Sequence, residues 1–565
     1  MTPNPTNPLI VQSDRSVLLE VDNPLYEAAR DKLAMFAELE KSPEHIHTYR
    51  ITPLSIWNAT AAGLQPEEII DALKQFSKFV VPENLQHEII ETASRYGCIT
   101  LVKKDDDLLL EINSIKLAVQ IEHHPKTAGL IDFHSEKSFI VQPKFRGEIK
   151  RVLTKIGFPV KDLAGYVDGT PLDVNLSKSF EVRDYQKEAA DNFYQGGGKE
   201  GGCGVVVLPC GAGKTIVGIN AMSKVKTHTL ILSANITALR QWRQELLEKT
   251  NLKPEDIAEY SGSVKEISSV TLCTYQILTY RPDKHTDYFP HFNLFHKKNW
   301  GLIIYDEVHL LPAPVFRITS DIQARRRLGL TATLIREDGK ETDVFSLVGP
   351  KRYDMPWKEL EAQQWLAKAE CNEIRVPLPE SEDLNYAISA DRQKFRIASE
   401  NPRKQEVILQ LIQQHKNDRI LIIGQYISQL RSLAKKLNAP LITGQTKQVD
   451  RDKLYGQFRT GEIQLLIVSK VGNFAVDLPD ANVAIQVSGT FGSRQEEAQR
   501  LGRVLRPKSG DNQAHFYTIV TYNSTEQDFA MKRQLFLTEQ GYSYSIINFE
   551  ENINLVHNQK TLKTQ

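Results

Sequence analysis

The sequence has little cysteine. Its 565 residues include five cysteines, and no two of them form a CxxC pair. Scattered cysteines of odd number argue against a disulfide framework, a zinc site or an iron–sulfur cluster. No apolar run approaches the length that spans a bilayer, and the polar, proline-rich start lacks the apolar segment of a secretory signal. We therefore expect a cytoplasmic protein without a membrane partner.

Net charge is also lacking. Lys+Arg and Asp+Glu each total 70, so the formal net charge is zero. Global electrostatic attraction therefore cannot argue for nucleic-acid binding, and any such surface must be local. The composition, 41% hydrophobic and 25% charged, is that of a globular protein, and the length predicts several domains.

Changes in hydrophobic pattern divide the chain. Residues 1–98 predict a mostly helical N-terminal domain, and residues 99–178 predict a small mixed domain with a linker, for which a DNA-recognition role stays open. Beyond residue 179, short and nearly continuous apolar runs alternate with helical patterns, as in doubly wound parallel sheets. We expect an α/β fold with two RecA-like lobes, over 179–345 and 346–545, followed by a C-terminal tail over 546–565.

A glycine-rich loop follows the first apolar run of the first lobe and leads into a predicted helix. Its residues are Pro209, Cys210, Gly211, Ala212, Gly213, Lys214 and Thr215. The glycines allow backbone N–H groups to face phosphates, Lys214 can reach the β- and γ-phosphates, and Thr215 can ligate Mg²⁺. The strict pattern would have glycine at Leu208. The loop predicts an ATP site.

An acidic pair, Asp306 and Glu307, ends the fourth apolar run of this lobe. Asp306 is placed to hold Mg²⁺, and Glu307 can orient and deprotonate the attacking water, which favours hydrolysis over phosphoryl transfer. His309 either reports the state of the γ-phosphate or packs at the strand end. Upstream, Arg183 and Gln186 lie where a glutamine can bind the adenine edge, although an ordinary surface helix is the alternative.

An arginine-rich block stands in the second lobe, with Gln499, Arg503 and Arg506 in the order Gln-Arg-x-Gly-Arg-x-x-Arg. Arginines presented to a triphosphate stabilise transition-state charge, so we expect Arg503 and Arg506 to act as arginine fingers. Between the catalytic halves stands Thr331-Ala332-Thr333, whose hydroxyls can couple nucleotide state to lobe orientation.

These motifs resemble the XPB family of superfamily 2 DNA helicases, and a bacterial or archaeal type is the better match. The matching segments are LPCGAGKT, DEVH, LGLTATLIRED and QRLGRVLRPK, with TYRITPLSIWNATAAGL and SRYGCITL near the N-terminus. The resemblance implies an unwinding element at Arg336, Glu337 and Asp338, and a thumb-like insertion near 380–400. It also implies 3′ to 5′ movement on DNA at a single-strand/duplex junction, and a repair protein or nuclease as a further partner.

The leading hypothesis is an ATP-dependent DNA helicase in DNA repair. The alternatives are a double-stranded DNA translocase that separates no strands, and an ATP-switched DNA clamp; Glu307 and the two arginines speak against the clamp. Residues at strand ends and loops are candidates for contacts to a DNA strand, although each is also a common loop residue. They are Asn235, Thr274, Tyr275, Gln276, Gly444 and Thr446.

Overall fold

The computed structural model describes most of the chain. The described residues are 4–42, 45–105, 107–165, 168–178, 180–198, 201–209, 211–283, 289–311, 315, 326–332, 341–355, 357–469, 481–489, 513–539, 542 and 544–549. Contacts divide the chain into two compact units, the first comprising 1–208 with 213–355 and the second comprising 209–212 with 356–565. In the described part of the chain, no helix is both long and apolar enough to cross a membrane.

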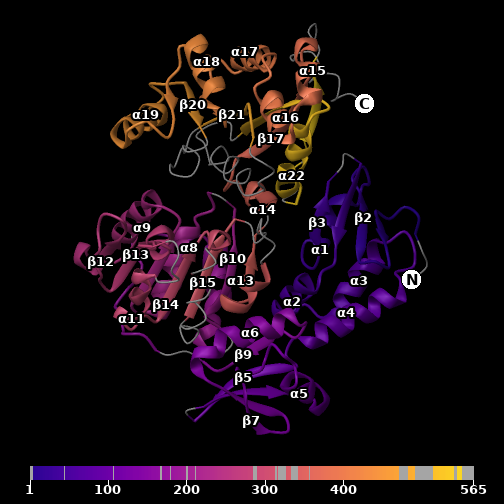
Figure 1. Ribbon diagram of the computed structural model, residues 1–565, viewed down its shortest axis with the longest axis vertical. Coiled ribbons are helices and arrows are strands. Elements are labelled where there is room, and N and C mark those ends of the chain that lie inside the picture. Colours follow the sequence, from indigo (N-terminus) through magenta and orange to yellow (C-terminus); the bar gives the residue numbers. More distant parts are fainter. Residues whose placement is uncertain are drawn as a thin grey trace. The chain divides into compact units, whose positions relative to one another are not determined.

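The first unit begins with a four-stranded antiparallel sheet in the order β1-β2-β4-β3. Its strands are β1 (Leu9–Val11), β2 (Ser16–Glu20), β3 (Glu38–Lys41) and β4 (Ile46–Arg50). The accompanying helices are α1 (Tyr26–Leu33), α2 (Pro53–Ala61), α3 (Pro66–Phe76) and α4 (Glu83–Arg95) (Figure 1). The hydrophobic pattern indicates β1 and β2 but not β3 and β4, whose sequences ELEK and IHTYR mix charged with apolar residues.

A small mixed domain follows, built on a five-stranded sheet in the order β7-β8-β6-β5-β9. Its elements are β5 (Ile99–Lys104), β6 (Asp107–Ile112), α5 (Ile115–Glu122), β7 (Asp132–Ser135), β8 (Ser138–Val141), α6 (Arg146–Lys155) and β9 (Val160–Asp162). One face of α5 and α6 packs on the sheet through Leu117, Ile121, Ile149 and Leu153, all buried in one apolar cluster. β9 pairs parallel to β5, so the chain leaves this domain alongside its first strand.

The first lobe is a seven-stranded parallel sheet in the order β12-β13-β11-β14-β15-β10-β16. Its strands are β10 (Cys203–Val207), β11 (Thr229–Ser233), β12 (Ile257–Tyr260), β13 (Val270–Thr274), β14 (Leu302–Asp306), β15 (Arg326–Thr331) and β16 (Lys351–Asp354). Its helices are α7 (Asp184–Tyr194), α8 (Lys214–Val225), α9 (Ile236–Lys249), α10 (Tyr275–Leu278), α11 (Leu294–Lys297) and α13 (Glu341–Leu347). The nearly continuous apolar runs of this lobe lie on β10, β11, β13, β14 and β15.

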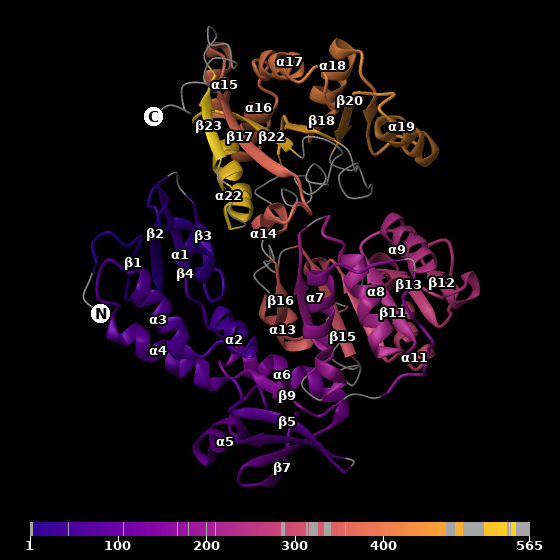
Figure 2. The same cartoon turned by 180° about the vertical axis from the view of Figure 1, so that it is seen from behind.

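The second unit holds another seven-stranded parallel sheet, in the order β19-β20-β18-β21-β22-β17-β23. Its strands are β17 (Lys368–Val376), β18 (Ile420–Gly424), β19 (Leu441–Ile442), β20 (Leu465–Ser469), β21 (Val483–Gln486), β22 (Gln513–Thr521) and β23 (Tyr544–Asn548). Its helices are α14 (Trp357–Ala362), α15 (Glu380–Ile388), α16 (Asp391–Ser399), α17 (Lys404–Gln414), α18 (Ile427–Leu437), α19 (Gln448–Thr460) and α22 (Thr525–Glu539) (Figure 2). The α/β fold with two parallel-sheet lobes is therefore confirmed.

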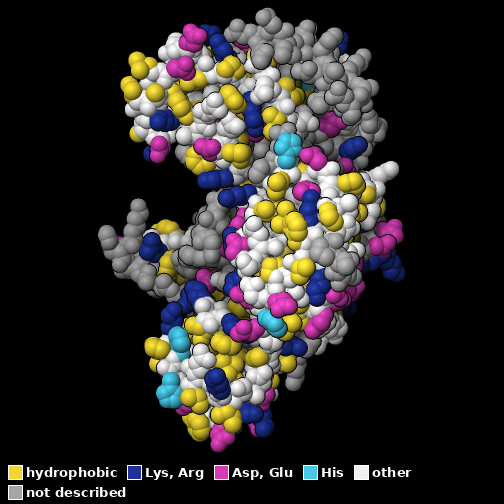
Figure 3. All heavy atoms as spheres, turned by 90° about the vertical axis from the view of Figure 1, so that its right-hand side faces the viewer, with side chains coloured by type: hydrophobic (Ala, Val, Ile, Leu, Met, Phe, Trp, Pro, Cys, Tyr) yellow, Lys and Arg dark blue, Asp and Glu magenta, His cyan; other side chains and the backbone are white. Residues whose placement is uncertain are grey.

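The surface matches the balanced composition. On the face drawn in Figure 3, acidic and basic side chains are interspersed among apolar and neutral ones. Among the described side chains on this face, such mixing gives no extended field of one sign.

Candidate active site

The glycine-rich loop joins β10 to α8, as the sequence predicts. Every residue of β10 is buried, and the backbone N–H of Leu208 donates to Thr331 O at 3.0 Å, which ties the loop to the neighbouring strand end. Gly211 has φ 86° and Gly213 has φ 79°, in the left-handed region that favours glycine. Lys214 and Thr215 then form the first turn of α8, whose helix dipole favours an anion at this end. Cys210 lies outside the described residues.

Gln186 lies against this loop from α7. A Cβ atom on Gly213 would stand 2.5 Å from Gln186 Nε2, so any larger residue there would have to displace this side chain. Gln186 Oε1 accepts a hydrogen bond from the backbone N–H of Arg183 at 3.2 Å, and Arg183 Nη1 contacts Tyr185 Oη at 3.2 Å. The structure thus brings the upstream motif to the phosphate loop, with the Gln186 carboxamide engaged at the start of its own helix.

Asp306 ends β14 beside the loop and is held by two donors. Ser233 Oγ and Trp242 Nε1 each donate to Asp306 Oδ2 at 3.1 Å. Burial, and after it the charge of the neighbouring Glu307, raise the pKa of Asp306 to about 6, although Trp242, Lys214 and Ser233 oppose this rise. The carboxylate is therefore poised to gain from a cation.

Glu307 follows in a left-handed conformation, with φ 52°. This backbone geometry is unfavourable for a non-glycine residue, and it accompanies a side chain that faces the loop lysine. Lys214 Nζ lies 3.3 Å from Glu307 Oε1. Burial alone would raise the pKa of Glu307, but Lys214 and His309 lower it below its usual value. The pair therefore keeps Glu307 ionised beside Asp306.

Glu307 Oε2 can accept a further hydrogen bond. Among the described residues, no partner gives the buried Glu307 Oε2 a hydrogen bond. No group of three or more His, Cys, Asp or Glu side chains in the described part of the chain could hold a metal ion alone. Mg²⁺ commonly binds one or two protein oxygens together with substrate phosphates, and Thr215 with Asp306 fits that donor set.

His309 and Thr331 form a direct link between two motifs. His309 Nδ1 lies 2.7 Å from Thr331 Oγ1 and 3.5 Å from Glu307 Oε2, and both His309 and Thr331 are buried. Ala332, also buried, follows at the end of β15. A contact path therefore runs from Lys214 through Glu307 and His309 to the predicted coupling motif.

Several predicted site residues fall outside the described part of the chain. They are Thr333, the triplet Arg336, Glu337 and Asp338, and the second-lobe residues Gln499, Arg503 and Arg506.

Candidates for DNA contacts prove to have local partners. Asn235 Oδ1 caps α9 by accepting from Ala238 N at 2.9 Å, and Thr274 Oγ1 accepts from Ile277 N at 3.4 Å. Tyr275 is buried and donates from its hydroxyl to Asp306 O at 2.9 Å, so it supports the acidic pair. Gln276 contacts Ala234 O, while Thr446 Oγ1 in the second unit accepts from Thr443 N at 2.9 Å beside Gly444.

Trp242 and Ser233 are site residues that the motifs do not reveal. Trp242 reaches Asp306 from α9 because Gly218 leaves room for it: a Cβ atom on Gly218 would lie 2.5 Å from the indole Cη2. Ser233 is the last residue of β11, which pairs with β14. Its place at the carboxyl end of the adjoining parallel strand is the signal that could have found it.

Comparison with known proteins decides the family. Three family models match, described as ERCC3/RAD25/XPB C-terminal helicase over residues 360–565, Helicase conserved C-terminal domain over 9–132, and Type III restriction enzyme, res subunit over 179–336. The DNA 3'-5' helicase XPB of Kineococcus radiotolerans is 53% identical over 548 residues, which are 96% of this chain and 97% of that protein. This chain belongs to the XPB family.

Other relatives extend the match. The DNA 3'-5' helicase XPB of Mycobacterium tuberculosis is 51% identical and covers 95% of this chain and 97% of its own length. The General transcription and DNA repair factor IIH helicase/translocase subunit XPB of Enterocytozoon bieneusi is 33% identical over 96% of this chain and 93% of its own length. The family resemblance stated from the motifs is confirmed, and it covers nearly the whole chain.

Proposed function

We propose that this XPB-family chain is an ATP-dependent DNA helicase that moves 3′ to 5′ and couples ATP hydrolysis to DNA unwinding or opening in repair. The observation that carries the proposal is the contact path from Lys214 through Glu307 and His309 to Thr331. It joins the phosphate loop, the acidic pair and the coupling motif in one cluster of buried and partly buried side chains. The printed names of the bacterial relatives, DNA 3'-5' helicase XPB, support the same activity.

In this proposal each residue of the first lobe has a defined task. The loop backbone and Lys214 bind the β- and γ-phosphates, and Thr215 with Asp306 holds Mg²⁺. Bound Mg²⁺ neutralises charge on the phosphate that is attacked. Glu307 orients the water and accepts its proton. Arg183 and Gln186 bind the adenine end.

Lys214 would contact Glu307 before ATP binds and a phosphate of ATP afterwards. In the present structure it lies beside Glu307 and lowers the pKa of that carboxylate. A phosphate that draws Lys214 away would remove this effect, so the pKa of Glu307 would rise and the carboxylate would become a stronger base. Base strength would thus increase only when ATP is bound.

The remaining roles rest on residue order and family membership. Arg503 and Arg506 would complete the charge stabilisation as arginine fingers, with Gln499 and Thr333 in coupling. Arg336, Glu337 and Asp338 would form the unwinding element. We assign the two N-terminal domains as 1–98 and 99–178. The expected lobe bounds of 179–345 and 346–545, with a tail over 546–565, are corrected, because β16 (Lys351–Asp354) belongs to the first-lobe sheet and β23 (Tyr544–Asn548) to the second-lobe sheet. In this assignment α15 and α16 are the thumb-like insertion near 380–400.

Two displacement assays test the proposal. A helicase releases the labelled strand of a 3′-tailed duplex in the presence of ATP and Mg²⁺, while the Glu307→Gln variant releases none. A double-stranded DNA translocase instead displaces the third strand of a triplex and leaves the duplex paired. Double-stranded DNA translocation is the second candidate function, because the name of the Enterocytozoon bieneusi relative includes helicase/translocase. Displacement of the third strand from the triplex, without strand release from the 3′-tailed duplex, would replace the helicase proposal with that of a translocase.

A further inference from the structure

A cavity of about 260 Å³ lies within the first unit, remote from the phosphate loop. Its walls include Cys203 and Arg327, at the amino-terminal ends of β10 and β15. The phosphate loop follows the carboxyl end of β10, so the cavity lies at the opposite edge of the same sheet. Other walls come from α6 and β9, from the ends of α2 and α4, and from the segment between α13 and β16.

The charged side chains that line the cavity are mainly cationic. They are Lys150, Lys161, Arg327 and Arg352, against the single carboxylate of Asp162. Arg327 is 1% exposed and Lys150 is 6% exposed. Placing several cations in one poorly hydrated site is costly unless anions accompany them.

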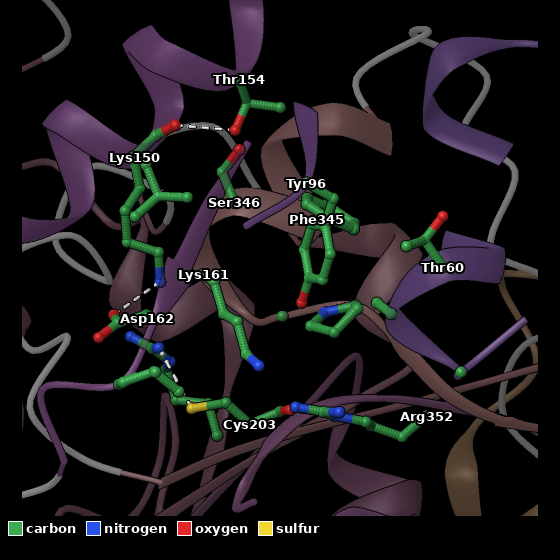
Figure 4. Close-up of a pocket in the computed structure, with 17 residues that line it drawn as sticks. Thr60, Tyr96, Lys150, Thr154, Lys161, Asp162, Cys203, Phe345, Ser346 and Arg352 are labelled. Carbon is green, nitrogen blue, oxygen red and sulfur yellow. Dashed lines mark hydrogen bonds and ion pairs between the residues drawn. The ribbon is translucent and has the colours of Figure 1, made fainter. Parts of the chain in front are cut away.

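Contacts with the protein fix the orientation of these cations. Lys150 Nζ lies 3.0 Å from Asp162 Oδ2, and Arg146 Nη2 lies 2.7 Å from Asp162 Oδ1, so Asp162 already serves two cations. Arg327 Nη2 donates to Cys203 Sγ at 3.3 Å, and Arg352 Nε donates to Cys203 O at 3.1 Å. Figure 4 shows Lys150 directed at Asp162, and Lys161 extending into the cavity toward the side where Cys203 and Arg352 lie.

The local potential is positive even with Asp162 present. Burial lowers the pKa of Lys150, Asp162 raises it, and the nearby Arg327 and Arg146 lower it again. Burial would raise the pKa of Asp162, but Lys150 and Arg146 hold it well below its usual range. The lowered pKa of Asp162 indicates that these cations stabilise a negative charge at this site.

We propose that this cavity binds a small oxyanion with the chemistry of phosphate, held by Lys161, Arg327 and Arg352. Its volume lies below the range of about 300–1,000 Å³ that is usual for sites of drug-sized ligands, which selects a compact anion. Arg327 is buried, so a phosphate within a DNA duplex cannot reach it. The anion would bridge wall segments from the N-terminal domain, the small mixed domain and the first lobe, and would stabilise their packing.

Thermal unfolding of the full chain tests the site. The Lys214→Ala background removes the anion site of the phosphate loop and makes the measurement independent of the proposed helicase activity. Inorganic phosphate at millimolar concentration, compared with chloride at equal ionic strength, should raise the Tm by about 2–4 °C. Adding Lys161→Gln should abolish this rise, whereas Lys161→Arg should retain most of it.

Lys116→Gln is the matched control, because Lys116 is an exposed lysine in α5 of the same small domain and does not line the cavity. It should leave the phosphate response unchanged. An equal response in the Lys161→Gln and Lys116→Gln variants would overturn the proposal, as would no response in the background itself. Loss of duplex binding in Lys161→Gln without any phosphate response would assign the lysine to DNA instead and would equally overturn it.

Discussion

Trp242 provides the sharpest test of how the fold tunes the acidic pair. Its indole Nε1 donates to Asp306 Oδ2 at 3.1 Å, while its ring fills the space beside Gly218. Trp242→Phe removes the N–H donor and keeps an aromatic ring in the same place. The ionised carboxylate of Asp306 thus loses one of its two side-chain donors, and the protonated form is favoured.

The expected size follows from the hydrogen bond. A hydrogen bond to a charged group contributes about 1.5–3 kcal/mol. One pKa unit corresponds to about 1.4 kcal/mol, so the pKa of Asp306 should rise by about one to two pKa units. This pKa is about 6 in the unmodified protein. In the proposed mechanism the ionised carboxylate would hold Mg²⁺, so the acidic limb of the pH profile of kcat/KM for Mg–ATP should move to higher pH by the same amount.

The assay is DNA-stimulated ATP hydrolysis measured from about pH 5 to 9, a window that spans the Asp306 value. Trp300→Phe is the matched control: Trp300 lies in the same lobe, is equally buried, and donates from Nε1 to Leu294 O at 3.0 Å. Both variants lose a buried indole hydrogen bond and both lose stability. This account of Asp306 would be refuted if the acidic limb of the kcat/KM profile did not move in Trp242→Phe. It would also be refuted if the limb moved equally in Trp300→Phe.

Further variants separate the steps of the cycle. Lys214→Ala and Glu307→Gln should each lower steady-state ATP hydrolysis below about a hundredth of the unmodified rate, while Glu307→Gln still binds a fluorescent ATP analogue. Thr331→Val removes the hydroxyl that contacts the adjoining histidine, so DNA stimulation of the ATPase should fall more than basal turnover. Arg503→Ala and Arg506→Ala should depress kcat far more than nucleotide affinity, and a pure affinity defect would remove the arginine-finger assignment.

The parallel sheets were predictable where apolar residues dominate a strand. β14 and β18 carry the runs Leu302–Tyr305 and Ile420–Ile423, which are fully buried. A strand covered on both faces must be apolar throughout, so its pattern identifies it without any knowledge of its partners. The acidic pair at the end of β14 was predicted to lie at the end of the sheet for the same reason.

β17 was missed because its sequence, KAECNEIRV, contains four charged residues. The strand nevertheless pairs with β22 and β23, and Glu373 and Asn372 are buried within it. The buried Glu373 has one partner in its own strand, since Arg375 Nε lies 2.6 Å from Glu373 Oε1, and one partner distant in the chain, since Gln534 also contacts Glu373. A hydrophobic pattern carries no information about such partners.

The same distinction explains how much of the site the sequence reveals. Short motifs contain Lys214, Asp306 and Glu307, and the consecutive residues of each motif are enough to predict their chemistry. His309, by contrast, has two plausible roles until its neighbour is known. Its contact at 2.7 Å is with Thr331, a residue 22 positions away on the adjacent strand. Because β14 and β15 pair in parallel and end at the same edge, the histidine after one strand meets the threonine that ends the other. A change at the phosphate site that moves Glu307 can therefore reach Thr331 through the His309 side chain alone. This favours a role for His309 in reporting the state of the γ-phosphate over simple packing.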